Sequence, residues 1–243
     1  MSFKHELDKR IQASRRPVAI FDLDGTLFDV TYRSMEILKR FLAQPDTRSH
    51  FPEQWAAASK LRYQDFLYSL EATLNNIGID RYSEYAARFL HAAETYWFKH
   101  FFTDDFVVHD VPYPGALSCV QSLRQQGVHI VYLSGRDIPN MSRGTLQALE
   151  NHGFPHQGHG ITVCLKPAYG QDDLLFKKQS IETISSEGEV IFTIDNEPAN
   201  VQMFLERFPE AFHVHFHSLF ARPMELRGQH LRVAKSFGEL GYA

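Results

Sequence analysis

The sequence FDLDGT, residues 21–26, decides the fold and the site expected for this 243-residue chain. It directly follows the apolar run PVAI (17–20), so a buried strand carries Asp22 and Asp24 at its end. Side chains alternate along an extended chain, which places both carboxylates on one side and turns the intervening leucine away. Gly25 can then turn the backbone sharply. Two carboxylates this close repel each other unless a cation or a shared proton compensates them, and such an oxygen-rich site suits Mg²⁺.

Short apolar runs of strand-like length recur along the chain. Most are continuous rather than alternating, which is typical of strands covered on both faces of a parallel sheet. Helical patterns separate them, including one that stops before a glycine and one that begins at a proline. This alternation predicts an α/β fold with an open sheet. The five strands are expected over 17–23, 127–134, 160–165, 189–195 and 211–217.

One region, residues 31–106, breaks the alternation because it contains three helical stretches and no strand run. Apolar residues recur in it at helical spacing, and both tryptophans, Trp55 and Trp97, lie here. This aromatic content indicates core packing rather than a platform for stacking bases. We therefore expect a catalytic α/β core formed by residues 1–30 and 107–243, with a helical module inserted over 31–106.

A strand-end turn capped by Asp24 would also explain the pair of carboxylates, but two other strand ends carry matching chemistry. Ligands of open α/β sheets bind at the carboxyl ends of the strands. The second expected strand ends in LSGRD, where Ser134 and the Gly135 amide can donate to an oxyanion. Arg136 adds a positive fork suited to phosphate. The fourth ends in TIDN with a third carboxylate, Asp195, so these groups together predict a phosphoryl-transfer site.

Three lysines are candidates for binding the phosphate. Lys177 and Lys178 are expected to open a helix, and Lys177 shares a stripe with Ile181 and Ile184 that should face the sheet. Lys178 lies about one hundred degrees round the helix, nearer solvent. Lys166 directly follows the third expected strand and remains the alternative. The helical phase therefore favours Lys177.

These motifs resemble those of the haloacid dehalogenase superfamily, with DLDGT as the first, LSGR as the second, a lysine as the third and IDN as the fourth. The resemblance covers roughly residues 15–30 and 107–220. It implies a Rossmann-like parallel sheet with helices on both faces, and a helical cap over 31–106. The fourth motif departs from the pattern of two adjacent acids, which leaves open whether Asn196 or Glu197 supports the metal.

The resemblance also implies a role for each motif residue. Asp22 would attack phosphorus and form a phosphoaspartate, and Asp24 would protonate the leaving oxygen and then activate water. The carboxylates of Asp22 and Asp195 and the backbone carbonyl of Asp24 would hold Mg²⁺. Ser134 and the lysine would bind the phosphoryl oxygens. The chain is thus expected to be a phosphatase of the superfamily that acts on a small phosphorylated metabolite.

Other functions fit the motifs less well. A phosphomutase would share the same core, and a nucleic-acid-end phosphatase is disfavoured by the formal net charge of -4. A dehalogenase has no need of the acid at Asp24, and an inactive binding module would not retain all four motifs. The amino-terminal segment is polar and no later stretch is long and apolar enough to span a bilayer, which predicts a cytoplasmic protein without membrane contact. The sequence does not specify an oligomeric state.

Two cysteines and two groups of histidines are assigned structural roles. Cys119 and Cys164 lie in apolar segments and are expected to be buried thiols rather than a disulfide. The sequence HVHFH places three histidines on one face of a strand, from His213 to His217. We interpret it as a terminal strand with a half-polar face rather than a metal site. The histidines of the loop 151–160 lack cysteines that would support a zinc site.

Overall fold

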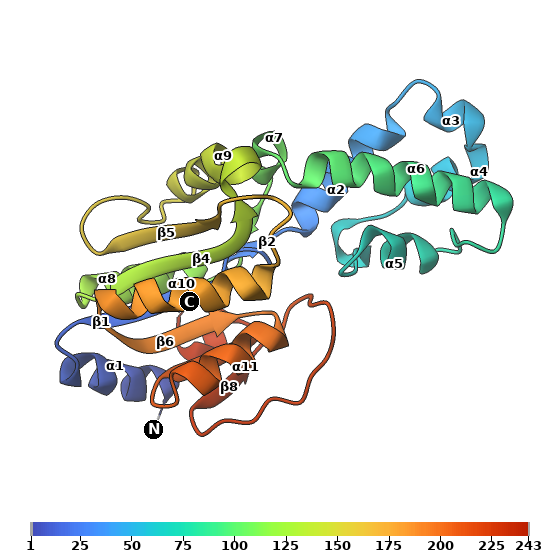
Figure 1. Cartoon of the computed structure of the whole chain (residues 1–243). Coiled ribbons are helices and arrows are strands. Elements are labelled where there is room, and N and C mark those ends of the chain that lie inside the picture. The colour runs from blue at the N-terminus through green and yellow to red at the C-terminus, as the bar shows by residue number, and fades with distance from the viewer. Residues whose placement is uncertain (1, 243) are drawn as a thin grey trace.

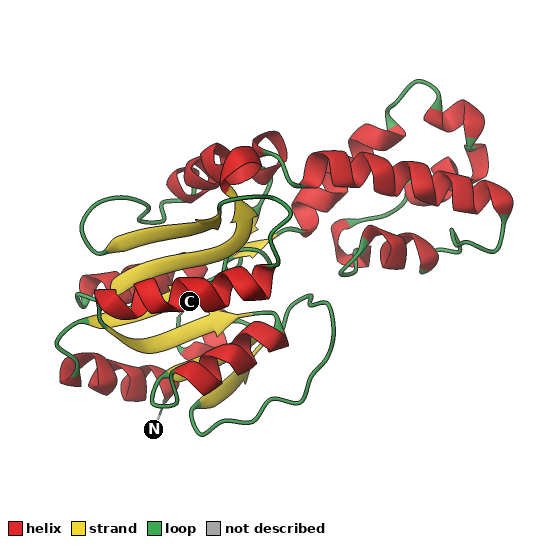
Figure 2. Ribbon diagram, viewed as in Figure 1, coloured by secondary structure: helices red, strands yellow, loops and turns green. Residues whose placement is uncertain are grey.

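A computed structural model describes residues 2–242 and consists of one parallel sheet, helices on both of its faces and a helical extension at one end (Figures 1 and 2). The described residues form a six-stranded sheet in the order β5-β4-β1-β6-β7-β8, and every neighbouring pair is parallel. The predicted Rossmann-like α/β fold is therefore confirmed. The strands are β1 (Pro17–Phe21), β4 (His129–Asp137), β5 (Ile161–Lys166), β6 (Glu189–Asp195), β7 (Phe212–Phe216) and β8 (Leu231–Ala234).

Alternating side chains of β1 enter two different parts of the core. Val18 and Ile20 pack on one face of the sheet, and Ala19 and Phe21 on the other, and all four are fully buried. A central parallel strand needs apolar residues on both faces, which explains the continuous run in the sequence. The first face is covered by α10 (Asp173–Glu187) and α11 (Pro198–Arg207), and the second by α1 (Phe3–Ala13) and α8 (Ala116–Gln125).

The helical extension leaves and rejoins the sheet region through a short antiparallel pair, β2 (Phe28–Asp29) and β3 (Val111–Pro112). Between these strands the described residues form helices and turns only, and we call this segment the insert (Figure 2). It has an apolar cluster of its own, centred on Leu74, Phe89 and Leu90. Its helices are α2 (Thr31–Leu42), α3 (Thr47–His50), α4 (Pro52–Ala58), α5 (Leu70–Asn75), α6 (Glu84–Phe101) and α7 (Asp104–Val107), with a 3-10 turn at Tyr63–Asp65.

The order of the strands determines where a ligand can bind. Beyond β1, the chain adds β4 and β5 on one side and β6, β7 and β8 on the other, so the direction of winding switches beside β1. Clefts form at the carboxyl ends of strands at such a switch point. Two further helical elements complete the core: α9 (Ile138–Asn151), which follows β4 directly and packs against α7, and a 3-10 turn at Phe237–Leu240.

Several elements were not predicted. Helix α9, helix α1 and strand β8 all carry short or mixed apolar patterns, and two of the four residues of β8 are exposed. Cys119 and Cys164 are free thiols as predicted, with Cys119 buried and Cys164 half-buried. Each helix in the described part of the chain is too short or too polar to cross a membrane.

The prediction that HVHFH forms a terminal strand with a half-polar face is wrong. Strand β7 lies between β6 and β8, and His213 and His215 are buried. His213 Nε2 donates to the Phe208 carbonyl at 2.9 Å, and its Nδ1 lies 2.8 Å from the Thr193 hydroxyl. Both ring nitrogens are satisfied, so a neutral histidine can occupy an interior position.

This burial should make the protein sensitive to acid. Burial lowers the pKa of His213 to about 4 from 6.5, although the Phe208 carbonyl opposes the shift. Between these values the unfolded chain binds a proton that the folded chain does not, so the free energy of unfolding falls as the pH falls, by at most about 3 kcal/mol. We expect the melting temperature of His213→Gln to fall less steeply than that of the wild type when the pH is lowered from neutral to about 5. His217→Gln, at an exposed site just after β7, should follow the wild type, and parallel curves for all three proteins would contradict the assignment.

Candidate active site

The ends of β1 and β6 bring two carboxylates onto one lysine. Asp22 follows β1 and is buried, with 6% of its surface exposed. Its Oδ1 accepts a hydrogen bond from Lys177 Nζ at 2.7 Å, and its Oδ2 accepts one from the Thr26 hydroxyl at 2.9 Å. Asp195, the last residue of β6, accepts a second bond from Lys177 Nζ, also at 2.7 Å. The lysine therefore bridges the first and fourth motifs.

The charges of this group do not cancel. Burial and the charge of Asp195 raise the pKa of Asp22 to about 7, although Lys177 opposes them. Burial alone would lower the pKa of Lys177, but Asp195 and Asp22 outweigh it and raise that pKa. When both carboxylates are ionised, two negative charges face one positive charge, so this end of the sheet favours a further cation.

Lys177 lies on the face of its helix that was predicted, but the helix begins earlier than was predicted. Helix α10 begins at Asp173, so Lys177 lies in its second turn rather than its first. It is buried on the face of α10 that packs on the sheet, whereas Lys178 is exposed. Lys166 Nζ donates to Asp173 Oδ1 at 2.6 Å and to two backbone carbonyls of the following loop. Of the three lysines, Lys177 is thus the one that contacts the carboxylates of Asp22 and Asp195.

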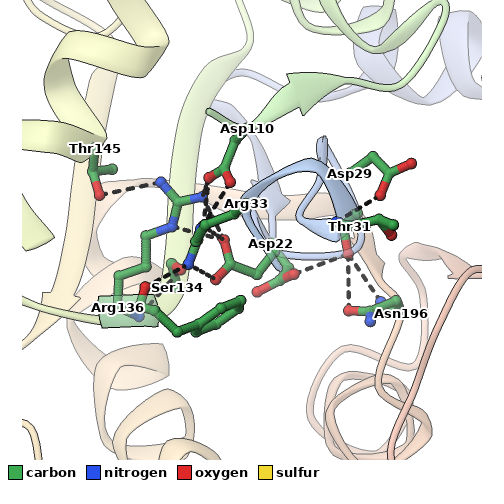
Figure 3. Close-up of polar contacts among 12 residues, drawn as sticks. Asp22, Asp29, Thr31, Arg33, Asp110, Ser134, Arg136, Thr145 and Asn196 are labelled. Atoms are coloured by element: carbon green, nitrogen blue, oxygen red, sulfur yellow. Dashed lines mark hydrogen bonds and ion pairs between the residues drawn. The ribbon is translucent and has the colours of Figure 1, made fainter. Parts of the chain in front are cut away.

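Asp24 turns its carboxylate away from Lys177 into a second cluster of charges. Asp24 Oδ1 accepts from Arg136 Nε at 2.7 Å and from Arg33 Nη2 at 3.2 Å. Both arginines also converge on Asp110, with Arg33 Nε at 2.8 Å from its Oδ1 and Arg136 Nη2 at 2.6 Å from its Oδ2 (Figure 3). We call these four residues the arginine–aspartate network. It joins β1 and β4 to both ends of the insert.

The network changes the assignment of Arg136. The sequence predicted a fork that binds phosphate, but Arg136 is 2% exposed and donates from all three nitrogens to Asp24, Asp110 and Thr145. The reason is that the chain comes back from the insert at Asp110, which places this residue beside Arg136 at the end of β4 although the two are distant in sequence. Burial alone would raise the pKa of Asp24, but Arg136 and Arg33 lower it to about 2. Arg136 therefore holds Asp24 as a carboxylate.

Two glycines of the motifs lie close to neighbouring side chains. Gly25 has a φ of 79°, and a Cβ there would lie 2.4 Å from the side-chain amide nitrogen of Asn196. A Cβ at Gly135 would lie 2.5 Å from the Asp173 carboxylate. Beside it, the Ser134 side chain is also buried. At Gly25 the positive φ adds backbone strain to this contact with a buried side chain, whereas at Gly135 the exposed Asp173 side chain could rotate away.

Neither residue after Asp195 contacts Asp22. The side-chain amide of Asn196 donates to the Leu219 carbonyl at 2.6 Å, and the Glu197 carboxylate accepts from the backbone amide of Ala221 at 3.1 Å. Burial and a hydrogen bond with Glu197 raise the pKa of Tyr68, a residue of the insert, to about 12. Asn196 and Glu197 thus connect the core to the loop after β7 and to the insert, and their suggested support of a metal stays a prediction.

These side chains lie at the base of a cavity of about 670 Å³ that is shared by the core and the insert. Asp22, Ser134 and Lys177 line it from the core. Among residues 2–242, no three side chains of His, Cys, Asp or Glu form a group that could hold a metal ion. The predicted magnesium set requires only two, Asp22 and Asp195, with the backbone carbonyl of Asp24. The excess negative charge described above fits that set.

Sequence reasoning missed several residues of the site. Thr26 lies inside the first motif, and its hydroxyl lies between Asp22 and Asn196. Asn200, which hydrogen-bonds both oxygens of Asp195 at 3.1 Å, could have been found as a polar residue in the first turn of α11. The partners Arg33 and Asp110 carry no local signal, because 77 positions separate them in the sequence.

Asp110 should be important for stability. Asp110→Asn keeps the shape of the side chain but leaves two buried guanidinium groups with Asp24 as their only carboxylate within the network. Removing one partner of a buried ion pair costs about 3 kcal/mol or more, and we expect urea unfolding to show a loss of that order. Asp105→Asn, on the exposed surface of α7, is the matched control and should change the free energy of unfolding little. Equal effects of the two substitutions would show that the network contributes nothing specific.

Comparisons with known proteins agree with this architecture. The family model of haloacid dehalogenase-like hydrolases matches residues 17–180. A structure from Burkholderia xenovorans described as a haloacid dehalogenase-like hydrolase aligns with a TM-score of 0.51 at 14% identity, covering 93% of this chain and 94% of that one. A structure from Clostridium difficile described as a phosphatase aligns at 0.51 with 10% identity and coverages of 83% and 85%.

A third structure shows how little the shared fold says about activity. Protein tyrosine kinase A of Mycobacterium tuberculosis aligns with a TM-score of 0.50 at 15% identity, covering 93% of this chain and 96% of that one. Identities this low establish the fold alone, and related folds carry different activities. No curated protein matches the sequence.

Proposed function

Because this chain belongs to the haloacid dehalogenase-like hydrolase family, we propose that it is a Mg²⁺-dependent phosphatase that hydrolyses a small phosphorylated molecule. One observation carries the proposal: Asp22 and Asp195 converge on Lys177 at the base of a cavity that Ser134 also lines. A nucleophilic carboxylate, a fixed ammonium and a hydroxyl donor are the groups that phosphoryl transfer requires.

In the first step, Asp22 Oδ attacks phosphorus, the bond from phosphorus to the leaving oxygen breaks, and an aspartyl phosphate forms. Thr26 and Lys177 hold the attacking carboxylate in place through its two oxygens. The leaving oxygen needs a proton, and Asp24 in its resting form has none, because Arg136 and Arg33 keep its pKa low. We therefore assign that proton to the substrate monoanion, with Asp24 passing it to the leaving oxygen.

In the second step, water attacks the phosphorus of the aspartyl phosphate, and the bond between phosphorus and Asp22 breaks. Asp24, again a carboxylate, takes the proton from the water and passes it to the departing phosphate, so that it returns to its resting carboxylate form. Inorganic phosphate leaves and Asp22 is regenerated. The arginine–aspartate network contributes here by fixing the orientation of Asp24, since both arginines contact it.

Mg²⁺, held by Asp22, Asp195 and the Asp24 backbone carbonyl, would neutralise charge on the phosphoryl group. The residues of this chain contribute the remaining positive charge through Lys177, and Asn200 keeps Asp195 oriented through two hydrogen bonds. The insert is proposed to act as the cap that encloses the substrate, because its residues line the same cavity as those of the core, and because burial and the Glu197 charge of the core raise the pKa of Tyr68 in the insert.

The test is hydrolysis of p-nitrophenyl phosphate with Mg²⁺ and with a chelator. We expect activity with Mg²⁺ and a loss of about a hundredfold on chelation, restored by added Mg²⁺, because Lys177 alone cannot balance two carboxylates and the negatively charged phosphoryl group. Undiminished activity in chelator would contradict the metal assignment. Release of free phosphate, with no transfer to a second alcohol group, separates a phosphatase from a phosphomutase.

A further inference from the structure

The cavity continues from the core into the insert, where its walls are mainly apolar. Trp97, Phe98 and Phe101 line it from α6, and Leu67 and Tyr68 line it from the segment before α5. Phe101 lies four positions after Trp97 and three after Phe98, so it neighbours both of them on the helix surface. This face points into the cavity rather than into the apolar cluster of the insert alone.

Three of these side chains are left in contact with water. Phe98, Tyr68 and Leu67 are 57%, 54% and 43% exposed, and all three line the cavity. Large apolar residues that gather at a cavity mark a surface that binds a ligand, whereas single exposed ones elsewhere need no explanation. Tyr85, on the same helix, is 59% exposed and does not line the cavity, so it provides a matched comparison.

The charges around the cavity disfavour anions beyond the reacting phosphate. Acidic residues outnumber basic ones among those that line it, and the two basic residues, Arg136 and Lys177, are already paired with carboxylates. None of the insert residues that line it is basic. Glu71 and Glu94 line it from α5 and α6, and Arg81 bridges them at 2.7 and 3.2 Å without lining the cavity itself.

We infer that the substrate is a phosphate monoester whose leaving group is apolar and carries no second negative charge. Its phosphate would lie at Asp22, and its apolar part would lie against Phe98, Trp97 and Tyr68. Glu94 lies seven residues from Phe101, or about 10 Å along the helix axis. A second charged group that reaches Glu94 would meet one excess negative charge, because Glu71 and Glu94 share a single cation, Arg81. A positively charged end group would be accepted there and a negatively charged one rejected. This inference rests on the proposed phosphatase activity.

The first arm of the test compares four esters on the wild-type protein with Mg²⁺: methyl phosphate, hexyl phosphate, ω-aminohexyl phosphate and the phosphate ester of ω-hydroxyhexanoic acid. We expect kcat/KM for hexyl phosphate to exceed that for methyl phosphate by about tenfold or more. The aminohexyl ester should match or exceed the hexyl ester, and the carboxylate-ended ester should be about tenfold worse. A preference for the carboxylate-ended ester, or no gain from the hexyl chain, would overturn the inference.

The second arm uses matched variants on α6. Phe98→Ala should lower kcat/KM for hexyl phosphate about tenfold and leave methyl phosphate within about twofold, since the methyl ester lacks the alkyl chain that would pack on this side chain. Tyr85→Ala should leave both unchanged. Glu94→Gln should reduce the discrimination against the carboxylate-ended ester, while Glu84→Gln, exposed in the first turn of the same helix, should not.

The outcomes separate this inference from the proposed function. If the wild type hydrolyses neither methyl phosphate nor p-nitrophenyl phosphate with Mg²⁺, the proposed phosphatase activity itself is wrong. If it hydrolyses both but the matched variants behave alike, only the apolar leaving-group site is wrong. Phe98 is largely exposed, so Phe98→Ala should fold; if a melt shows otherwise, the Glu94 and Glu84 variants still decide the charge arm.

Discussion

We expect Asp22→Asn to lower kcat for p-nitrophenyl phosphate by about a thousandfold or more. The amide has the size and shape of the carboxylate but lacks the charge and the lone-pair basicity of the attacking oxygen. In the variant the remaining side-chain oxygen can still accept from Lys177, and the amide nitrogen can donate to the Thr26 hydroxyl oxygen, so the side chain should keep its position. The effect should therefore appear in kcat rather than in KM. Turnover by the purified variant and by the wild type, at saturating substrate and Mg²⁺, measures it.

The same substitution offers a control for folding. Burial raises the pKa of Asp22 to about 7, so in the protein without bound metal the folded state holds a proton on Asp22 below that pH and carries a buried negative charge above it. For a group whose pKa is raised, the stabilising contribution is present at low pH and is lost as the pH rises through the folded value. Asp22→Asn should therefore melt at the wild-type temperature or above it at about pH 8 in chelator. A well-folded variant with near-normal turnover would refute the phosphoaspartate mechanism.

Lys177→Ala should be the second most damaging substitution, with kcat/KM falling by about a thousandfold. Its ammonium is the cation that contacts both Asp22 and Asp195, at 2.7 Å each. Losing one preorganised charge at a reacting group costs about a hundredfold to a thousandfold in rate. The two carboxylates would also be left without their shared partner, which adds to the upper end of that range. Steady-state kinetics with p-nitrophenyl phosphate over a range of Mg²⁺ concentrations measures the loss.

The neighbouring lysines are the controls for this prediction. Lys178→Ala should be close to neutral because that side chain is exposed. Lys166→Ala removes the partner of Asp173, 2.6 Å away, and should have an effect between the other two. A larger loss in Lys178→Ala than in Lys177→Ala would show that the contacting lysine is not the functional one. If neither matters and Lys166→Ala abolishes activity, Lys166 is the phosphate ligand.

Local sequence patterns determined the fold class and the positions of most strands. The run before Asp22 had to be a central strand because it is apolar at consecutive positions, and all five of its residues are buried. The polar residues that end β1, β4 and β6 then had to meet, since parallel strands of one sheet present their carboxyl ends at the same edge. The helical phase around Lys177 likewise identified the lysine that faces the sheet.

Pairings between distant segments were decided only by the tertiary structure. Nothing near Arg33 or Arg136 in the sequence indicates that both contact Asp110, so the fork expected to bind phosphate holds Asp24 instead. Strand β7 became an interior strand because β8, which has little apolar signal, pairs with it. The spacing of apolar residues along a helix or strand predicts which of its faces is buried, because it depends only on residues close together in the sequence. It does not report which remote side chain will share that buried space, and an ion pair depends on both partners being brought together by the rest of the fold.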